Sequence, residues 1–281
     1  MHLVVLLALV LQIGAPSEPQ AVRGQDRLRE DRVESTALGR SMKYRVLVPD
    51  EYAKSQRRYP VLYLLHGLGG DYTDWTARSN VADYSRTLPL IIVMPDGNNA
   101  WYTNSDEGAY ETYILNDLQA DVVKKYRTIN SRYGRAIAGL SMGGYGALKM
   151  ALKRPALFAV AGSFSGAFGA TRDGDLEKLI SKPEADRLQK IFGPPGSDSR
   201  KENDLFVLAG AVRAAGAPYF YIDCGIADNS LIAANREVVA AIHKAGAAYE
   251  YHEVAGAHSW DYWDRRIREF LPVLLRRLAN N

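Results

Sequence analysis

The chain has very little cysteine and histidine. A single cysteine, Cys224, occurs among 281 residues, so no intramolecular disulfide can form. It lies in an apolar run, residues 218–224, where a small thiol is expected to pack as a buried hydrophobe. The histidines are scattered without metal-ligand spacing, so we expect no metal site and no cofactor. They are His2, His66, His243, His252 and His258.

An excess of charge of one sign is also lacking. The chain carries 35 Lys and Arg against 32 Asp and Glu, a formal net charge of +3, which does not favour a nucleic-acid partner. Hydrophobic residues make up 47% and charged residues 24%, an ordinary globular composition. The chain is long enough for a central sheet covered on both faces.

Long hydrophobic runs are scarce. Residues 3–13 are almost wholly apolar, which is too short to span a bilayer but suits the core of a signal peptide. No Lys or Arg precedes this run, and no clean small-residue cleavage site follows it. We interpret residues 1–30 as a signal peptide or a disordered N-terminal segment and expect a secreted or periplasmic protein. The alternative is a cytoplasmic protein with an apolar tail.

Beyond residue 30 the pattern alternates strands and helices, which predicts an α/β fold with a mostly parallel sheet and helices on both faces. No repeat or linker divides residues 31–281, so we predict one domain, with an insertion at about 166–204 where the pattern loosens. The expected strands are 32–38 paired with 42–48, then 60–65, 90–94, 135–138, 158–164, 218–224 and 247–254. The expected helices are 110–126, 145–152, 230–244 and 260–278.

The most informative motif is G-x-S-x-G at residues 139–143. It lies between an apolar run and a helix-prone run, the context of a nucleophile elbow. The chain reverses so tightly there that the flanking positions have no room for a Cβ. Ser141 is therefore a candidate nucleophile that attacks an acyl carbon.

A serine nucleophile needs a histidine base and a carboxylate that orients the base. In α/β-hydrolases these follow the serine in the order acid, then histidine, each in a loop after a strand. His258 fits this placement. Asp228 is the candidate acid, with Asp223, inside the preceding strand, as its rival. The structural alternative for Asp228 is a helix cap.

An oxyanion hole requires backbone N–H groups directed at the developing alkoxide. The residue after the nucleophile, Met142, is one expected donor. The second is expected in the glycine-rich loop after the strand at 60–65: Leu68, with Gly67 as a near alternative. His66 is expected to brace this loop rather than act as a base.

These motifs together resemble the esterase D/putative esterase family of α/β-hydrolases. They are H-G-L-G-G at 66–70, G-L-S-M-G-G at 139–144, D-C-G at 223–225 followed by Asp228, and G-A-H-S-W at 256–260. The resemblance covers the chain from about residue 35 to its end. It implies an α/β-hydrolase fold, a triad of Ser141, Asp228 and His258, and oxyanion donors at Leu68 and Met142.

The same resemblance implies a serine esterase acting on short-chain or carbohydrate-linked (acetyl or feruloyl) esters. Residues 98–104 are similar to a segment that lines the acyl pocket in some members, which makes Trp101 and Tyr102 candidate substrate contacts. Trp260 is a third, as part of an aromatic surface. The chain lacks the S-G-L-T-C segment of S-formylglutathione hydrolases, yet thioester hydrolysis and acyl transfer stay as alternatives, and a non-catalytic binding protein is a different class. Homo-oligomerisation stays open.

Overall fold

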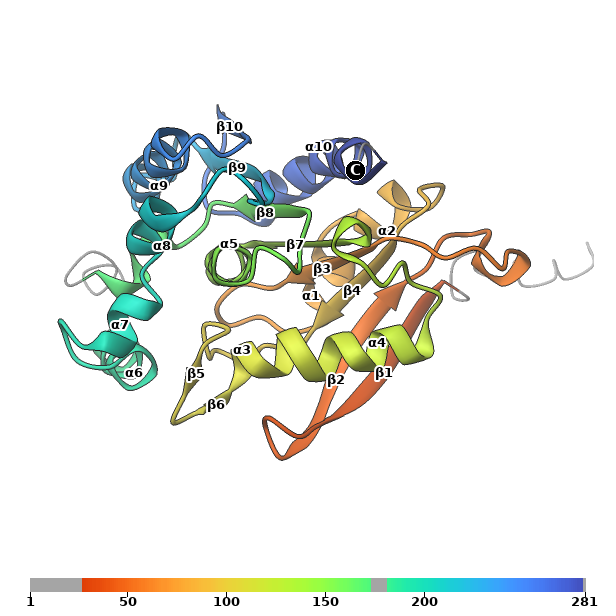
Figure 1. Cartoon of the computed structure of the whole chain (residues 1–281), viewed down its shortest axis with the longest axis horizontal. Coiled ribbons are helices and arrows are strands. Elements are labelled where there is room, and N and C mark those ends of the chain that lie inside the picture. The colour runs from red at the N-terminus through yellow and green to blue at the C-terminus, as the bar shows by residue number, and fades with distance from the viewer. Residues whose placement is uncertain (1–26, 173–180, 280–281) are drawn as a thin grey trace, which may run out of the picture.

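The computed structural model describes residues 27–172 and 181–279. Its centre is an eight-stranded sheet with the order β1-β2-β4-β3-β7-β8-β9-β10, in which only β2 runs against the other strands (Figure 1). The strands are β1 (Leu28–Ser35), β2 (Arg40–Leu47), β3 (Val61–Leu65), β4 (Ile91–Pro95), β7 (Arg135–Leu140), β8 (Val160–Phe164), β9 (Tyr219–Gly225) and β10 (Tyr249–Val254), and β5 (Asn104–Ser105) and β6 (Gly108–Ala109) form a separate pair.

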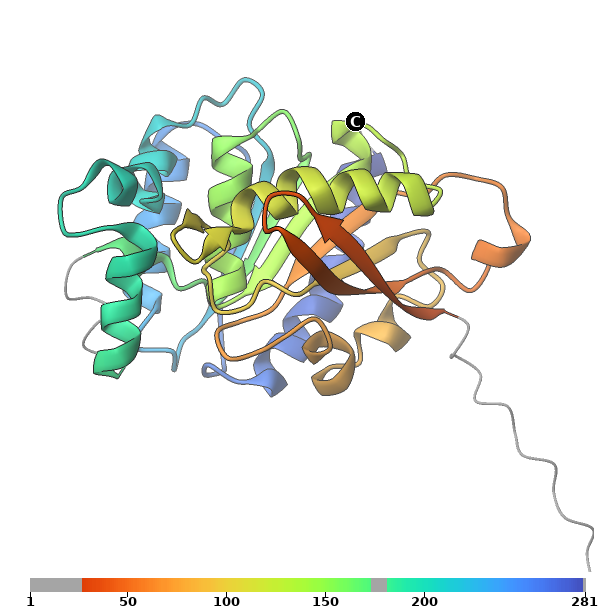
Figure 2. The same cartoon turned by 90° about the horizontal axis from the view of Figure 1, so that it is seen from below.

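Helices cover both faces of the sheet, as predicted. Figure 2 shows α3 to α4 on one side and α10 on the other. The α-helices are α1 (Asp74–Arg78), α2 (Val81–Tyr84), α3 (Tyr110–Thr112), α4 (Gln119–Lys125), α5 (Met142–Lys153), α6 (Lys182–Phe192), α7 (Asp198–Glu202), α8 (Leu205–Ala211), α9 (Ile232–Lys244) and α10 (Trp260–Ala279). Short helices are η1 (Tyr52–Lys54), η3 (Arg132–Gly134), η4 (Phe168–Thr171) and the π-helical η2 (Tyr113–Leu118).

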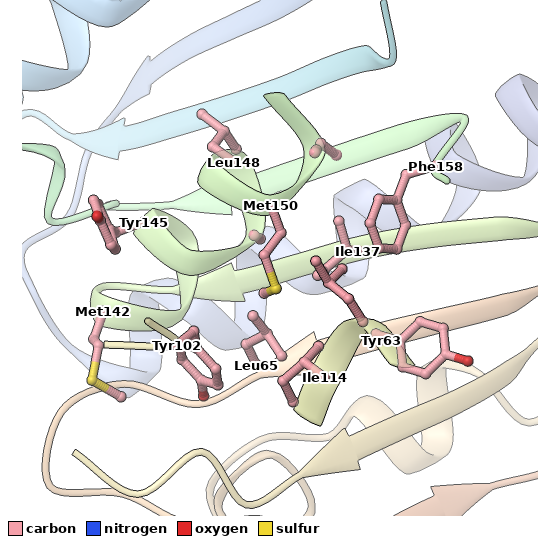
Figure 3. Close-up of a cluster of buried hydrophobic side chains, with 14 of the residues drawn as sticks. Tyr63, Leu65, Tyr102, Ile114, Ile137, Met142, Tyr145, Leu148, Met150 and Phe158 are labelled. Carbon is pink, nitrogen blue, oxygen red and sulfur yellow. The ribbon is translucent and has the colours of Figure 1, made fainter. Parts of the chain in front are cut away.

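The core consists of two layers separated by the sheet. Side chains alternate along β3, so Val61, Tyr63 and Leu65 join the layer beneath α5, whereas Leu62 and Leu64 join the layer beneath α10. Figure 3 shows the first layer, with Tyr63 and Leu65 among its members. Because both faces are covered, all five β3 residues are buried, as expected for a strand in a parallel sheet.

Several element boundaries differ from the sequence prediction. The first hairpin pairs as expected, but β1 begins earlier, at Leu28. It also ends earlier, at Ser35, because the left-handed Gly39 (φ +62°) closes a longer loop before β2. Residues 28–30 therefore belong to the sheet and not to an N-terminal segment. The expected helix 110–126 contains the π-helical turn η2. The expected insertion contains η4, α6 and α7.

The predicted signal peptide lies mostly outside the described residues. Within the part of the chain that the structure describes, no helix has both the length and the apolar character that a bilayer crossing requires. Cys224 is buried in β9, in accordance with the sequence prediction.

Candidate active site

Ser141 lies at the turn between β7 and α5, at the carboxyl edge of the sheet. Its backbone is left-handed (φ 53°, ψ −118°), which is uncommon for a residue with a side chain and costs free energy. Three backbone hydrogen bonds hold it there: its N–H donates to the Phe164 carbonyl (3.0 Å), and its carbonyl accepts from the N–H groups of Tyr145 (3.0 Å) and Ala167 (3.1 Å). The fold thus keeps the serine in a conformation that the isolated chain would avoid.

The flanking glycines permit this turn because the backbone passes too close for a side chain. A Cβ on Gly139 would lie 2.5 Å from the carbonyl carbon of Gly143. A Cβ on Gly143 would lie 2.5 Å from the His66 carbonyl oxygen. Both distances are shorter than real Cβ contacts allow, so the G-x-S-x-G pattern is a steric requirement of the turn.

The structure brings the three predicted triad residues together. His258, in the loop between β10 and α10, places Nε2 3.0 Å from the Ser141 Oγ. Its Nδ1 lies 2.7 Å from the Asp228 carboxylate, in the loop after β9. A proton on Nδ1 is donated to the carboxylate, which leaves Nε2 free to accept the serine hydroxyl proton. Asp228 is buried, with only 3% of the residue exposed, which strengthens this interaction.

The rival acid, Asp223, lies elsewhere. Its side chain is fully buried inside β9 and accepts hydrogen bonds from Tyr262 (2.8 Å) and Arg266 (3.0 Å) of α10. Burial raises the pKa of the Asp223 carboxyl, and the Arg266 guanidinium opposes that change. Asp223 therefore joins α10 to the sheet, while Asp228 faces the histidine.

The glycine-rich loop after β3 borders Ser141, as expected for an oxyanion loop. A Cβ on Gly67 would approach Leu140 Cδ1 at 2.6 Å and Ser141 Cβ at 3.5 Å, so its backbone packs directly against the turn. Among the hydrogen bonds of the described residues, none uses the N–H of Leu68 or of Met142. Both amides, the predicted oxyanion donors, are thus available to an oxygen at the serine.

His66 braces this loop from within the core. It is fully buried; its Nε2 accepts the Gly97 N–H (2.9 Å), and its Nδ1–H donates to the Gly67 carbonyl (2.8 Å). Burial lowers the pKa of the imidazole, so the ring stays neutral. The sequence interpretation of His66 as a structural residue agrees with this geometry.

A pocket of about 460 Å³ opens beside Ser141 and His258. Its remaining lining residues come from the glycine loop, α1 and the start of α10: Gly67, Leu68, Gly69, Gly70, Asp74, Arg78, Leu140, Ser259, Trp260, Asp261 and Trp263. Trp260 therefore lies where a substrate contact was predicted.

Trp101 and Tyr102 do not reach this pocket, and the prediction that their side chains contact substrate needs correction. Trp101 is 2% and Tyr102 0% exposed. Trp101 packs edge-on against Tyr145 and Phe192, and the Tyr102 hydroxyl donates to the His66 carbonyl (3.0 Å). Their left-handed backbones (φ 53° and 51°) turn these rings under α5, which the sequence alone did not reveal.

Charged residues of the pocket were missed by the sequence reading. The Arg78 guanidinium lies 5.0 Å from the centre of the Trp260 ring, within cation–π range. Asp74 lines the glycine loop, and burial raises the pKa of its carboxyl. The only local signal was their position shortly after that loop. No group of three or more metal-ligating side chains occurs among residues 27–172 and 181–279.

The mainly parallel sheet, with a serine on the strand-to-helix turn and a carboxylate–histidine pair in later loops, defines an α/β-hydrolase. The family model described as "Putative esterase" matches residues 35–274. The chain belongs to this family, in agreement with the resemblance drawn from its motifs.

Proteins of similar sequence are named as esterases. Esterase Rv1288 of Mycobacterium tuberculosis (strain H37Rv) is 33% identical over 281 residues, covering 89% of this chain and 60% of the relative; the chain thus spans less than two thirds of that protein. An acetyl esterase of Caldicellulosiruptor saccharolyticus is 28% identical, covering 73% of this chain and 79% of the relative.

Solved structures agree on the fold. The fluorophosphonate-binding serine hydrolase FphF of Staphylococcus aureus superimposes with a TM-score of 0.78 at 25% identity, over 88% of this chain and 97% of that one. A ferulic acid esterase gives a TM-score of 0.77 at 26% identity, over 89% and 97% of the two chains.

Proposed function

We propose that this chain is a serine carboxylic ester hydrolase that uses Ser141, His258 and Asp228 as a catalytic triad. The observation that carries the proposal is the continuous line of contacts from the Ser141 hydroxyl through the imidazole to the Asp228 carboxylate, 3.0 and 2.7 Å long. A serine hydroxyl alone is a poor nucleophile, and this arrangement supplies the base that it lacks.

The reaction follows from this geometry in two halves. Ser141 Oγ forms a bond to the ester carbonyl carbon while His258 Nε2 takes the hydroxyl proton, and the Leu68 and Met142 N–H groups stabilise the oxyanion. The tetrahedral intermediate collapses, the bond to the alcohol oxygen breaks, and His258 gives the proton to the departing alcohol. A water molecule then repeats the sequence on the acyl-enzyme and releases the carboxylic acid and free serine.

The proposed substrates are short-chain esters or acetyl and feruloyl esters of carbohydrates. Relatives named acetyl esterase and ferulic acid esterase support this class. So does a pocket that combines the Trp260 ring with the polar side chains of Arg78, Asp74 and Asp261, because sugars and phenolic rings pack on aromatic faces and need polar partners at their edges. Comparing acetyl, butyryl and feruloyl esters would rank these acyl groups.

Ser141→Ala tests the nucleophile. We expect turnover of a short-chain p-nitrophenyl ester to fall by at least about 10³-fold, because triad members act as a unit, with the unfolding curve unchanged. Labelling by a fluorophosphonate probe should disappear at the same time. Ser55→Ala, in a loop after η1, is the matched control and should retain both. Activity retained by Ser141→Ala would overturn the proposal.

Acyl transfer or thioester hydrolysis on the same residues is the second candidate. Its support is the 26% identity to the diacylglycerol acyltransferase/mycolyltransferase Ag85B of Mycobacterium leprae and the likeness to the S-formylglutathione hydrolase FrmB of Staphylococcus aureus, with a TM-score of 0.76. Product analysis with an added alcohol acceptor, together with an S-formylglutathione assay, separates these activities from ester hydrolysis. We also propose export, which the size of the mature protein in a secreted or periplasmic fraction would test.

A further inference from the structure

Residues 97–103, between β4 and β5, have an unusual backbone. Asn98, Trp101 and Tyr102 all adopt left-handed conformations, with φ of 47°, 53° and 51°. Residues with side chains avoid this region, and such strain persists only where the surroundings impose the conformation. Three instances within five residues therefore require strong anchoring contacts.

This segment holds the candidate oxyanion loop at three points. The Gly97 N–H donates to His66 Nε2 (2.9 Å), and the Tyr102 hydroxyl donates to the His66 carbonyl (3.0 Å). The Asn99 side-chain oxygen accepts the Gly69 N–H (2.7 Å). These contacts bracket Leu68 on both sides along the chain, so the position of the Leu68 N–H depends on the segment.

The Tyr102 ring lies in a narrow slot between Gly97 and Gly146, called here the Tyr102 slot. A Cβ on Gly97 would lie 2.2 Å from this ring, and a Cβ on Gly146 of α5 would lie 2.6 Å from it. Figure 3 shows the Tyr102 ring beside α5, between the Met142 and Leu65 side chains. Close packing on two glycines leaves the hydroxyl little freedom to leave the His66 carbonyl.

The ammonium group of Lys149 anchors the far end of the segment. Lys149 lies on α5, two turns after the serine, and is 0% exposed. Its Nζ donates to the Tyr102 carbonyl (2.8 Å) and the Thr103 Oγ1 (2.6 Å), and it pairs with Glu111 (2.9 Å). Burial lowers the pKa of Lys149 to about 8, against the opposing effect of Glu111, so the group is largely charged at neutral pH.

A buried charged network of this kind is seldom retained for stability alone, because well-packed apolar residues would serve as well. Here the Lys149 ammonium donates to the carbonyl of Tyr102, a left-handed residue whose hydroxyl donates to the His66 carbonyl. The path runs from Lys149 through Tyr102 and His66 to the loop of Leu68, and each step is either a hydrogen bond of 3.0 Å or less or a covalent connection along the chain.

We propose that Lys149 is a positioning residue of the oxyanion loop: by fixing residues 97–103 it sets, through Tyr102 and His66, the place of the Leu68 N–H opposite Ser141. The inference rests on the proposed function, since the loop matters in this way only if an oxyanion forms at the serine.

Lys149→Met and Tyr102→Phe test the inference. Tyr102→Phe keeps the ring in its slot and removes only the hydroxyl. We expect kcat for a p-nitrophenyl ester, per site titrated with a fluorophosphonate, to fall about 10- to 100-fold in each variant, since a misplaced donor forfeits much of an oxyanion-hole effect. KM should change less than about threefold, and the affinity for a boronic acid transition-state analogue should fall in parallel with kcat.

The control is Tyr44→Phe, which removes a buried hydroxyl bonded to Asp121 on another part of the sheet. It should leave kcat per titrated site unchanged. A purely structural role of Lys149 predicts the same for Lys149→Met, with only a lower melting temperature, and that result would overturn the inference.

The two single variants and their double variant together keep the outcome decisive. If Lys149→Met does not fold, a wild-type kcat in folded Tyr102→Phe overturns the inference, and a reduced kcat at constant KM supports it. If both single variants fold, the double variant should be no slower than the slower single one, because both act on one path. An inactive Ser141→Ala together with unimpaired Tyr102→Phe and Lys149→Met would reject this inference alone, whereas an active Ser141→Ala would reject the proposed function itself.

Discussion

At the scale of single residues, His66 shows how a buried imidazole is held in one protonation state. Its Nε2 accepts an N–H from Gly97 and its Nδ1–H donates to Gly67. A second proton on Nε2 would place two donors against each other inside the core. Burial lowers the pKa of His66 below its ordinary value of 6.5. Once protonated, the imidazole can no longer accept the Gly97 N–H, and the glycine loop loses that support.

This geometry predicts an acid-sensitive contribution to stability. Below pH 6.5 the unfolded chain takes up a proton at residue 66 that the folded chain refuses, so the free energy of unfolding falls as pH is lowered through 6.5, by at most about 1.4 kcal/mol per pH unit. His66→Gln removes this proton site. Urea unfolding between pH 5 and 8 should show that the difference in the free energy of unfolding between wild type and variant narrows toward acid pH. A constant difference would contradict the lowered pKa of His66.

At the scale of elements, α5 depends on small residues where other segments cross it. Gly139 and Gly143 let the turn close, and Gly146 lets the Tyr102 ring lie against the helix. Glycine normally weakens a helix, so Gly143 and Gly146, which lie within α5, exchange helix stability for a close approach. The helix that starts directly after Ser141 is thus shaped by what must pack against it.

Gly146→Ala and Gly210→Ala separate these two effects of glycine. A methyl group at residue 146 would meet Tyr102 at 2.6 Å, whereas one at residue 210, on the exposed side of α8, meets nothing within 4 Å. We expect Gly146→Ala to lower the free energy of unfolding by about 1–3 kcal/mol and to reduce kcat. Gly210→Ala should raise the free energy of unfolding by about 0.4–1 kcal/mol. Equal changes in the free energy of unfolding for the two variants, measured by denaturant titration, would argue against close packing of Tyr102 on Gly146.

The sequence allowed prediction of those parts of the site that local patterns encode. The glycines around Ser141 and the placement of Asp228 and His258 after successive strands follow from turn sterics and chain order, so the structure brings these residues together as expected. The burial of Tyr102 has no local signature, because it depends on Gly146 of the distant helix α5 as well as on the nearby Gly97. Lys149 falls in a run that simply predicts helix, and nothing nearby in the sequence indicates a buried ammonium.

At the scale of the whole molecule, α10 determines where His258, the proposed base, lies. The helix begins at Trp260, two residues after His258, and returns along the sheet face opposite α5. One of its polar attachments to the sheet is the Arg266–Asp223 pair, 3.0 Å apart and nearly fully buried. The position of the loop that carries His258 and the packing of the second core layer therefore depend on the same helix.

Breaking this pair should affect stability and activity together. Arg266→Met leaves the Asp223 carboxylate buried without its cation, and we expect a loss of about 3–5 kcal/mol, with a lower kcat as the start of α10 loosens. Adding Asp223→Asn removes the stranded charge, so the double variant should unfold at higher denaturant than Arg266→Met. Guanidinium titrations of four proteins, namely wild type, Arg266→Met, Asp223→Asn and the double variant, measure this coupling, and simple additivity would speak against it.

The Tyr102 slot also bears on how this family can diversify. Its two walls, Gly97 and Gly146, come from segments 49 positions apart in the chain and touch the same ring. Neither glycine can gain a side chain while the tyrosine stays, and a smaller residue at 102 would leave a void between them. Across the lineage these three positions should therefore change as a set, so a substitution at one of them marks a homologue in which the oxyanion loop is supported by a different architecture.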